Sequence, residues 1–257
     1  MFRNQYDTDV TVWSPQGRLH QVEYAMEAVN QGTVCIGLRN DNFAVLAALK
    51  RAPNDLASYQ KKLQKIDDHM GVGISGLTAD GRSLVKYMRN EALNHKYVFG
   101  TPIQGSRLVL DLADMHQQCT QSYIRRPYGV GLLVATYDQT GPHLYMTEPS
   151  GDYYEFRAMA IGSRSQTSRT YLEREYDKFN GCSMEELIKY GLKSLAASLG
   201  GDSQLDSKSV SVGVVGANQP FRIIENDAIQ PYLDMVEVEG VQGVAMETEV
   251  VLESPDF

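Results

Sequence analysis

Apolar side chains recur at two spacings along the chain, and these spacings divide it into helices and strands. A spacing of three or four residues, which places side chains on one face of a helix, predicts a helix over residues 19–30, ended by Gly32. The same spacing predicts further helices at residues 79–95, 107–123, 165–178 and 183–199. Ser183, with Glu186 three residues later, has the pattern of a capping box and marks the start of the last helix.

Short apolar runs bounded by turn residues predict the strands. Two of them, at residues 34–38 and 43–49, flank the turn Asn40-Asp41-Asn42. The remaining runs, of which the last two form a closing hairpin, lie at residues 72–74, 131–137, 143–146, 153–156, 210–215 and 221–224. Because strand runs alternate with pairs of helices, we expect sheets in the middle of the molecule and helices outside them. The pattern predicts one domain over residues 1–236.

The two ends of the chain lack this apolar pattern. Residues 1–13 have no apolar face and are predicted to form an extended arm, and the turn residues Ser14 to Gly17 follow it. Residues 237–257 are acidic and have too little periodic apolar surface to pack, so they are predicted to form a disordered tail.

Charge and cysteine content exclude several classes of partner and site. The formal net charge is −8, and no Lys or Arg follows Arg222, so the acidic end repels phosphates and anionic lipid. We therefore expect no nucleic-acid and no membrane partner, and no apolar stretch reaches the roughly 18 residues of a membrane span. The three scattered cysteines, Cys35, Cys119 and Cys182, are typical of a reducing compartment and predict neither a disulfide framework nor a structural zinc site.

Other candidate motifs have simpler interpretations. The five histidines show neither HxxxH nor HExxH spacing, so no metal site is predicted. The glycines of segment 71–76 imitate a dinucleotide-binding fingerprint, but no strand–turn–helix unit follows, so we expect a glycine-rich strand and no cofactor. On spacing alone, the lysines of segment 61–65 indicate a solvated turn. Tyr87, Tyr97 and Tyr123 stand at helix positions and are expected to pack inside.

One segment of about 20 residues is far more specific. Residues 6–25, YDTDVTVWSPQGRLHQVEYA, strongly resemble the N-terminal signature of proteasome alpha subunits. Blocks at residues 76–80, 126–133 and 160–166 resemble the family's other motifs in the same order, so the resemblance covers about residues 1–235. It implies an α+β fold: the four-layer αββα sandwich of the N-terminal-nucleophile hydrolases, preceded by the helix at residues 19–30.

The resemblance also implies a function. It is that of a non-catalytic structural and gating subunit in the alpha ring of the 20S proteasome core, which degrades ubiquitin-tagged proteins to peptides in the cytoplasm and nucleus. The implied partners are the other alpha subunits of a hetero-heptameric ring, the beta ring, and the C-terminal tails of a regulatory particle or activator. Helix 19–30 is expected to help build the ring contact, unless its apolar stripe packs only on its own subunit.

The alternative is a self-processing N-terminal-threonine amidohydrolase of the same fold. Gly32-Thr33 has the required dipeptide, and Lys62 lies where the family's catalytic lysine falls. By similarity, however, the catalytic subunits carry an aspartate where Leu49 stands, and an apolar side chain cannot serve as the charge partner of a lysine. Cleavage after Gly32 would also discard the signature segment. We therefore expect no catalytic residue.

The resemblance assigns two further sets of residues. Tyr6-Asp7-Thr8 resembles the family's Tyr-Asp-Arg gate motif, with threonine in place of arginine. Because the guanidinium is missing, this arm is expected to make fewer salt bridges in the closed gate. By the same similarity, Tyr6 and Asp7 join Pro15 and Tyr24 in the cluster that holds the open gate.

The second set is a pocket for the C-terminal tails of activators. Capture of a terminal carboxylate needs a cation and backbone donors in a concave site. Lys62 matches the family's pocket lysine, and the wall residues that match are Leu19, Glu23 and Gly32.

Overall fold

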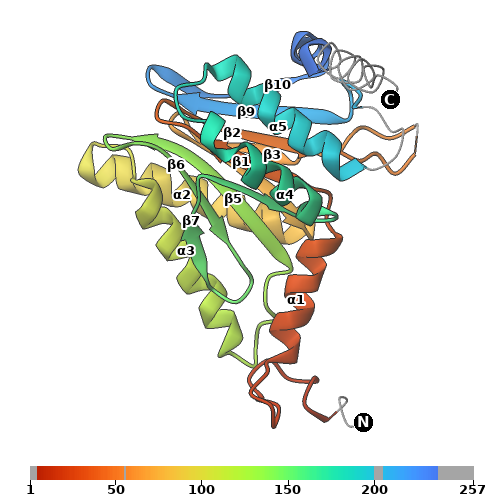
Figure 1. Ribbon diagram of the computed structural model, residues 1–257. Coiled ribbons are helices and arrows are strands. Elements are labelled where there is room, and N and C mark those ends of the chain that lie inside the picture. The colour runs from red at the N-terminus through yellow and green to blue at the C-terminus, as the bar shows by residue number, and fades with distance from the viewer. Residues whose placement is uncertain (1–4, 55, 200–204, 237–257) are drawn as a thin grey trace, which may run out of the picture.

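The computed structural model describes residues 5–54, 56–199 and 205–236, and it shows two stacked antiparallel sheets between two pairs of helices (Figure 1). The four-layer αββα sandwich expected from the sequence is confirmed. The predicted acidic tail, residues 237–257, lies outside the described residues. No helix within the described ranges is both long and apolar enough to cross a membrane.

The first sheet has the strand order β10-β9-β2-β1-β8. Its strands are β1 (Cys35–Arg39), β2 (Phe43–Leu49), β8 (Ala158–Ile161), β9 (Val210–Gly216) and β10 (Gln219–Glu225). Its outer face is covered by α4 (Ser165–Glu175), a short 3₁₀ turn (Tyr176–Lys178) and α5 (Met184–Leu199). The predicted capping box begins α5: the Ser183 amide donates to Glu186 Oε2 at 2.8 Å, and the Glu186 amide donates to Ser183 Oγ at 3.2 Å.

The second sheet has the strand order β3-β4-β5-β6-β7. Its strands are β3 (Leu63–Asp67), β4 (Met70–Gly76), β5 (Val130–Asp138), β6 (Gly141–Thr147) and β7 (Tyr153–Glu155). Its outer face is covered by α2 (Thr78–Phe99) and α3 (Gly105–Thr120). Helix α1 (His20–Gln31) stands at one end of the sandwich, where it contacts β4 and β5 (Figure 1). A 3₁₀ turn (Asn226–Ile229) and a helical segment, residues 230–236, follow β10.

The unbroken apolar run of β2 is explained by burial on both faces. Val45 and Ala47 pack toward α4 and α5, whereas Ala44, Leu46 and Ala48 pack toward the other sheet. Successive side chains of a strand point to opposite faces, so a strand buried on both faces shows no polar alternation.

Strand β4 packs closely against the first sheet, and its glycines allow this approach. Val72 and Ile74 point toward α2 and α3. On the opposite face of the strand, the ring of Phe221 fills the space beside Gly71, and the sulfur of Cys35 fills the space beside Gly73. The predicted glycine-rich strand is confirmed, and its glycines serve packing between the sheets.

We expect Gly71→Ala to destabilise the subunit by about 1–3 kcal/mol, because an added methyl would overlap the buried ring of Phe221. Thermal unfolding of the particle that carries the variant measures this effect. The double variant Gly71→Ala/Phe221→Leu makes room for the methyl and should be less destabilised than the sum of the two single variants. Strictly additive effects would contradict this explanation of the glycine.

Two strands were missed by the sequence analysis. The segment interpreted as a solvated turn begins β3, in which Leu63 and Ile66 are buried while Lys65 faces solvent. The turn interpretation is therefore wrong. Strand β8 has only four residues and lies at the edge of its sheet. The outward lysine of β3 weakens its apolar pattern, and β8 has only four residues, which is too short a run to mark a strand.

Candidate gate arm and lysine site

The N-terminal arm projects from the end of the sandwich, beyond the start of α1 (Figure 1). Its described part, residues 5–19, runs in bends and turns rather than as the extended segment that was predicted. Ser14 is buried, and its Oγ accepts the backbone N–H groups of Gln16 at 3.3 Å and Arg18 at 3.1 Å. Gly17 has φ +74°, a conformation that glycine adopts without strain. The predicted turn at residues 14–17 is confirmed.

Two hydrogen bonds tie the arm to α1. The Tyr24 hydroxyl donates to Asp7 Oδ2 at 3.0 Å, and the Gln21 side-chain amide donates to the Asp7 carbonyl oxygen. The structure thus brings together two of the predicted gate residues, Asp7 and Tyr24. Gln21 was missed because a side-chain bond to a backbone carbonyl 14 residues away leaves no pattern in the sequence.

The other gate residues lie apart from this pair. Tyr6 is half-buried, whereas Thr8 and Pro15 are exposed. Within the described residues, the hydrogen bonds to Asp7 come from Gln21 and Tyr24 and from none of these three. Their assignment to the gate stays a prediction from the resemblance.

The start of α1 holds a bidentate ion pair. Arg18 Nε and Nη2 lie 2.6 Å from Glu23 Oε1 and Oε2, and His20 Nδ1 lies 3.4 Å from the same carboxylate. The hydrogen bond from Arg18 is the main cause that lowers the pKa of Glu23. In the free subunit, the Glu23 carboxylate is therefore already paired with the Arg18 guanidinium.

The four predicted pocket residues do not meet within one chain. An α-helix rises about 1.5 Å per residue, so Glu23 lies roughly 13 Å along α1 from Gly32. Leu19 lies farther still. Lys62, in contrast, lies close to Gly32, because its side chain hydrogen-bonds the next residue, Thr33.

Lys62 lies just before β3, and its side chain is 4% exposed. Its Nζ donates to the Thr33 carbonyl oxygen at 2.7 Å, and the same oxygen lies 3.2 Å from Ser75 Oγ. The Ser75 hydroxyl also lies 3.0 Å from the Val29 carbonyl oxygen, in the last turn of α1. The link between α1 and β1 is therefore held by the side chain just before β3 and by a side chain of β4.

The charge of Lys62 has no acidic partner. Within the described residues, no ion pair joins it to a carboxylate. Burial lowers the pKa of the ammonium from 10.5 to about 8; the thiol of Cys35 acts against this shift, and the guanidinium of Arg51 adds to it. The folded chain thus binds fewer protons than the unfolded chain between about pH 8 and 10.5, so the charge destabilises the fold by roughly 3 kcal/mol below pH 8. A buried cation of this kind is suited to receive an anion.

Thr33 is placed differently from an activated nucleophile. Its Oγ1 is buried without a hydrogen-bond partner among the described residues. Lys62 contacts the carbonyl oxygen of Thr33 rather than the hydroxyl. Leu49 ends β2, and its amide donates to the Val34 carbonyl at 3.1 Å.

Helix α1 packs on its own chain. Val22, Ala25 and Val29 form its buried stripe, together with His20. The stripe therefore serves at least the subunit's own core, the alternative that the sequence analysis left open, while Tyr24 remains exposed on the same helix.

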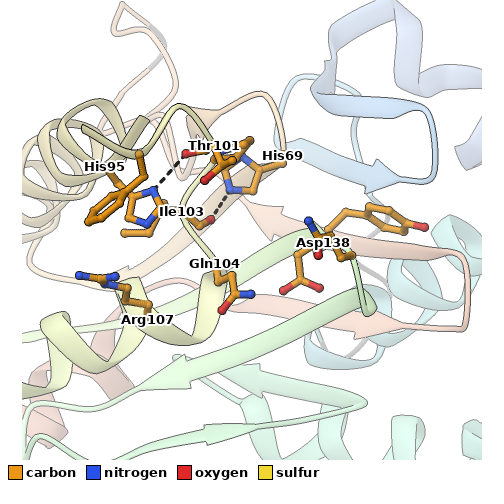
Figure 2. A pocket seen from close by; sticks show the side chains of 11 residues that line it. His69, His95, Thr101, Ile103, Gln104, Arg107 and Asp138 are labelled. Carbon is orange, nitrogen blue, oxygen red and sulfur yellow. Dashed lines mark hydrogen bonds between the residues drawn. The ribbon is translucent and has the colours of Figure 1, made fainter. Parts of the chain in front are cut away.

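A hollow of about 640 Å³ lies at the end of the second sheet that is opposite α1, between the end of α2 and the start of α3 (Figure 2). Its wall includes His69 and His95, which hydrogen-bond the carbonyl oxygens of Ile103 at 2.7 Å and Thr101 at 3.0 Å, and the Arg107 guanidinium, 5.6 Å from the ring centre of Phe99. The hollow is mostly apolar and touches neither the arm nor Lys62.

The last turns of α2, beside this hollow, expose large apolar side chains. Tyr97 is 90% exposed, and its neighbours Leu93, Val98 and Phe99 are exposed as well. The prediction that Tyr97 and Tyr123 pack inside is wrong, since Tyr123 is also exposed. Aromatic residues at helical spacing do not reveal whether their helix extends past the sheet that it covers.

Comparisons with known proteins agree with this architecture. Residues 29–215 match the family model for proteasome subunits, and residues 6–28 match the model for the N-terminal signature of A-type proteasome subunits. An alpha type-1 proteasome subunit from Dictyostelium discoideum is 53% identical over 249 residues, 96% of this chain and 100% of that protein. Its counterpart from Drosophila melanogaster is 51% identical, over 88% of this chain and 82% of that protein. A probable alpha type-6 proteasome subunit from Schizosaccharomyces pombe is 49% identical, over 93% and 88%.

The sandwich fold, the arm with its helix and these matches together define the class: the chain belongs to the proteasome alpha-subunit family. Within that family it is similar to alpha type-1 subunits of several species. It is a structural subunit of the alpha ring and assembles with other proteasome subunits, and the alpha-type signature favours this function over the self-processing hydrolase.

Proposed function

We propose that this chain is a non-catalytic subunit that helps gate the 20S proteasome core. The observation that carries the proposal is the pair of hydrogen bonds from Gln21 and Tyr24 to Asp7, which connects the signature arm to α1. An arm fixed at its base to a packed helix can take a defined position at the end of the molecule. The arm would close or open the entrance to the ring together with the arms of its neighbours.

The lack of catalysis is supported by the surroundings of Thr33. Activation of a threonine needs its own free amine and a lysine near its hydroxyl. Here Lys62 is bonded to the carbonyl oxygen of Thr33 rather than to its hydroxyl. Release of Thr33 would also remove α1, whose stripe of Val22, Ala25 and Val29 is part of the core.

We further propose that Lys62 receives the C-terminal carboxylate of an activator tail. Its burial without an acidic partner supports this role, since an arriving anion would restore the favourable charged form. Gly32 lies beside it on the same chain. Leu19 and Glu23, at the other end of α1, would line a pocket whose second wall is a neighbouring subunit.

The partners follow from the same resemblance. We propose the other alpha subunits and the beta ring as neighbours, and the exposed apolar end of α2 as one surface that another proteasome subunit covers, because large apolar patches mark interaction sites. We also propose that the particle works in the cytoplasm and nucleus, which imaging of a fluorescently tagged chain would test.

Deletion of residues 1–9 tests the gate. We expect only a modest rise in basal peptide hydrolysis by the assembled particle, because the arms of the other subunits remain in place. Fluorogenic peptide turnover without activator measures it, with the wild-type particle as the lower limit and a particle that lacks every arm as the upper limit. A rise that reaches this limit, or no rise at all, would contradict the shared-gate function.

A further inference from the structure

A small cavity of about 130 Å³ lies between the last turns of α1, the ends of β6 and β8, and the start of α4. The apolar part of its wall includes Met26, Val29, Met146, Met159 and Ile161, and the polar part includes Thr147, Glu148, Ser165 and Arg169. None of the residues assigned above to the gate or to the tail pocket lines it. The cavity is therefore separate from both of those sites.

Two buried polar atoms of this wall have no hydrogen-bond partner among the described residues. One is Oγ1 of Thr147, whose side chain is fully buried, and the other is Nε of Arg169. A buried polar atom that stays unpaired is costly to the fold, because it has given up its bonds to water. Both atoms therefore indicate that something polar occupies the cavity.

The start of α4 is suited to bind a carboxylate. Among the described residues no side chain caps this helix, so the N–H groups of its first turn can point at a ligand. Ser165 Oγ accepts a hydrogen bond from Arg169 Nη2 at 3.1 Å, which leaves the hydroxyl proton of Ser165 for donation. The guanidinium and the hydroxyl thus offer donors to one anion, beside the positive end of a helix.

Glu148 supplies the opposite charge to the same cavity. It is half-buried, and no ion pair within the described residues joins its carboxylate to a cation. Burial raises the pKa of Glu148; the carboxylate of Asp152 acts in the same direction, and the guanidinium of Arg169 acts against it. An ammonium group beside Glu148 would favour its ionised form. The cavity therefore has a place for each charge of a zwitterion.

The volume of the cavity limits the size of this zwitterion. An apolar cavity of about 150 Å³ holds benzene, which has six non-hydrogen atoms. Alanine has the same number of non-hydrogen atoms, and its methyl group can contact the methionines of the wall. A long or aromatic side chain exceeds the space of about 130 Å³.

From this arrangement we propose that the cavity binds a small free α-amino acid, from glycine to serine in size. Its carboxylate lies at Ser165 and Arg169, and its ammonium group lies at Glu148. The bound amino acid connects α1, β6 and α4, which the empty cavity leaves apart. This proposal goes beyond the gating function and does not depend on it.

The test follows hydrogen exchange of this chain in the assembled particle, in segments 26–30, 146–149 and 165–169. The ligands are L-alanine, L-alaninamide without the carboxylate, N-acetyl-L-alanine without the ammonium group, and L-phenylalanine as the control for size, each at about 10 mM. For a dissociation constant of about 1 mM, L-alanine should slow exchange about tenfold, because opening of these segments then requires release of the ligand. The other three ligands should leave exchange unchanged.

Two variants test the two charged ends of the site. Arg169→Gln and Glu148→Gln should each abolish the slowing by L-alanine. Arg174→Gln is the matched control and should retain it, because Arg174 is an exposed arginine of the same helix and lies outside the cavity wall. The comparison of ligands uses the wild-type particle, so it does not depend on how well the variants fold.

Three outcomes would overturn the proposal. If L-alanine causes no slowing, water alone fills the cavity. If the amide or the acetylated ligand slows exchange as much as L-alanine does, the site does not recognise a zwitterion. If the slowing persists in particles that contain the Arg169→Gln chain, the amino acid binds elsewhere.

Discussion

Lys62→Met in the assembled particle is expected to weaken binding of an activator tail at this one pocket by roughly ten- to a hundredfold. Burial lowers the pKa of Lys62 from 10.5 to about 8, a difference that corresponds to roughly 3 kcal/mol. A carboxylate at Nζ recovers part of this free energy and adds a charge-assisted hydrogen bond. The expected loss is therefore larger than that of an exposed lysine–carboxylate pair, which contributes up to about 1 kcal/mol.

The same pocket should bind tails less well as the pH rises through 8. Lys62 in the empty pocket is charged below pH 8 and neutral above it, so the affinity should fall by about tenfold between pH 7 and 9. Cys35, whose pKa burial raises to about 11, stays neutral in this range. Tail binding near pH 8 should accordingly take up protons, which calorimetry in buffers of different ionisation enthalpy detects.

Photo-crosslinking of a synthetic tail peptide to this chain isolates the pocket from the others in the ring. Lys61→Met is the matched control, because Lys61 is the exposed neighbour of Lys62 and has the same charge. Equal crosslinking in the Lys62→Met and wild-type particles, or a pH dependence that survives in Lys62→Met, would contradict the receptor role.

Tyr97→Asp combined with Leu93→Asp is expected to prevent incorporation of the chain into the particle. Both side chains are exposed on the last turns of α2, the helix whose His95 and Phe99 line the hollow shown in Figure 2. Burial of two unpaired carboxylates against another subunit would cost several kcal/mol, enough to exclude the chain from the assembly. Co-purification with tagged neighbouring subunits measures incorporation.

Ser83→Asp is the control, because it adds a carboxylate to an exposed position nearer the start of the same helix. Circular dichroism of the free double variant shows whether it still folds. Normal incorporation of a folded double variant would show that this surface faces solvent in the particle.

Helices and strands were predictable from the sequence where the apolar spacing depends only on residues of the same element. The apolar stripe of α1 and the capping box at Ser183 depend on neighbours three or four positions away, and the structure contains both. Strand β2 was predictable because burial on both faces makes its apolar run continuous. Strand β3 was not, because its outward lysine hides a short edge strand.

The candidate site was predictable in identity but not in geometry. The resemblance selected Lys62, yet its burial depends on a carbonyl 29 residues earlier that the fold brings beneath it. The role of Gln21 in holding the arm was not predicted for the same reason: its partner is a backbone oxygen that only the fold brings close. The exposure of Tyr97 depends on where α2 extends past the sheet, which spacing along one helix does not encode.

The most direct test of the non-catalytic gating function is the intact mass of this chain within the assembled particle, after treatment with an inhibitor that modifies catalytic N-terminal threonines. We expect a chain that retains the segment before Thr33, arm and α1 included, and carries no inhibitor. A chain that begins at Thr33, or one whose mass is increased by that of the inhibitor, would contradict that function.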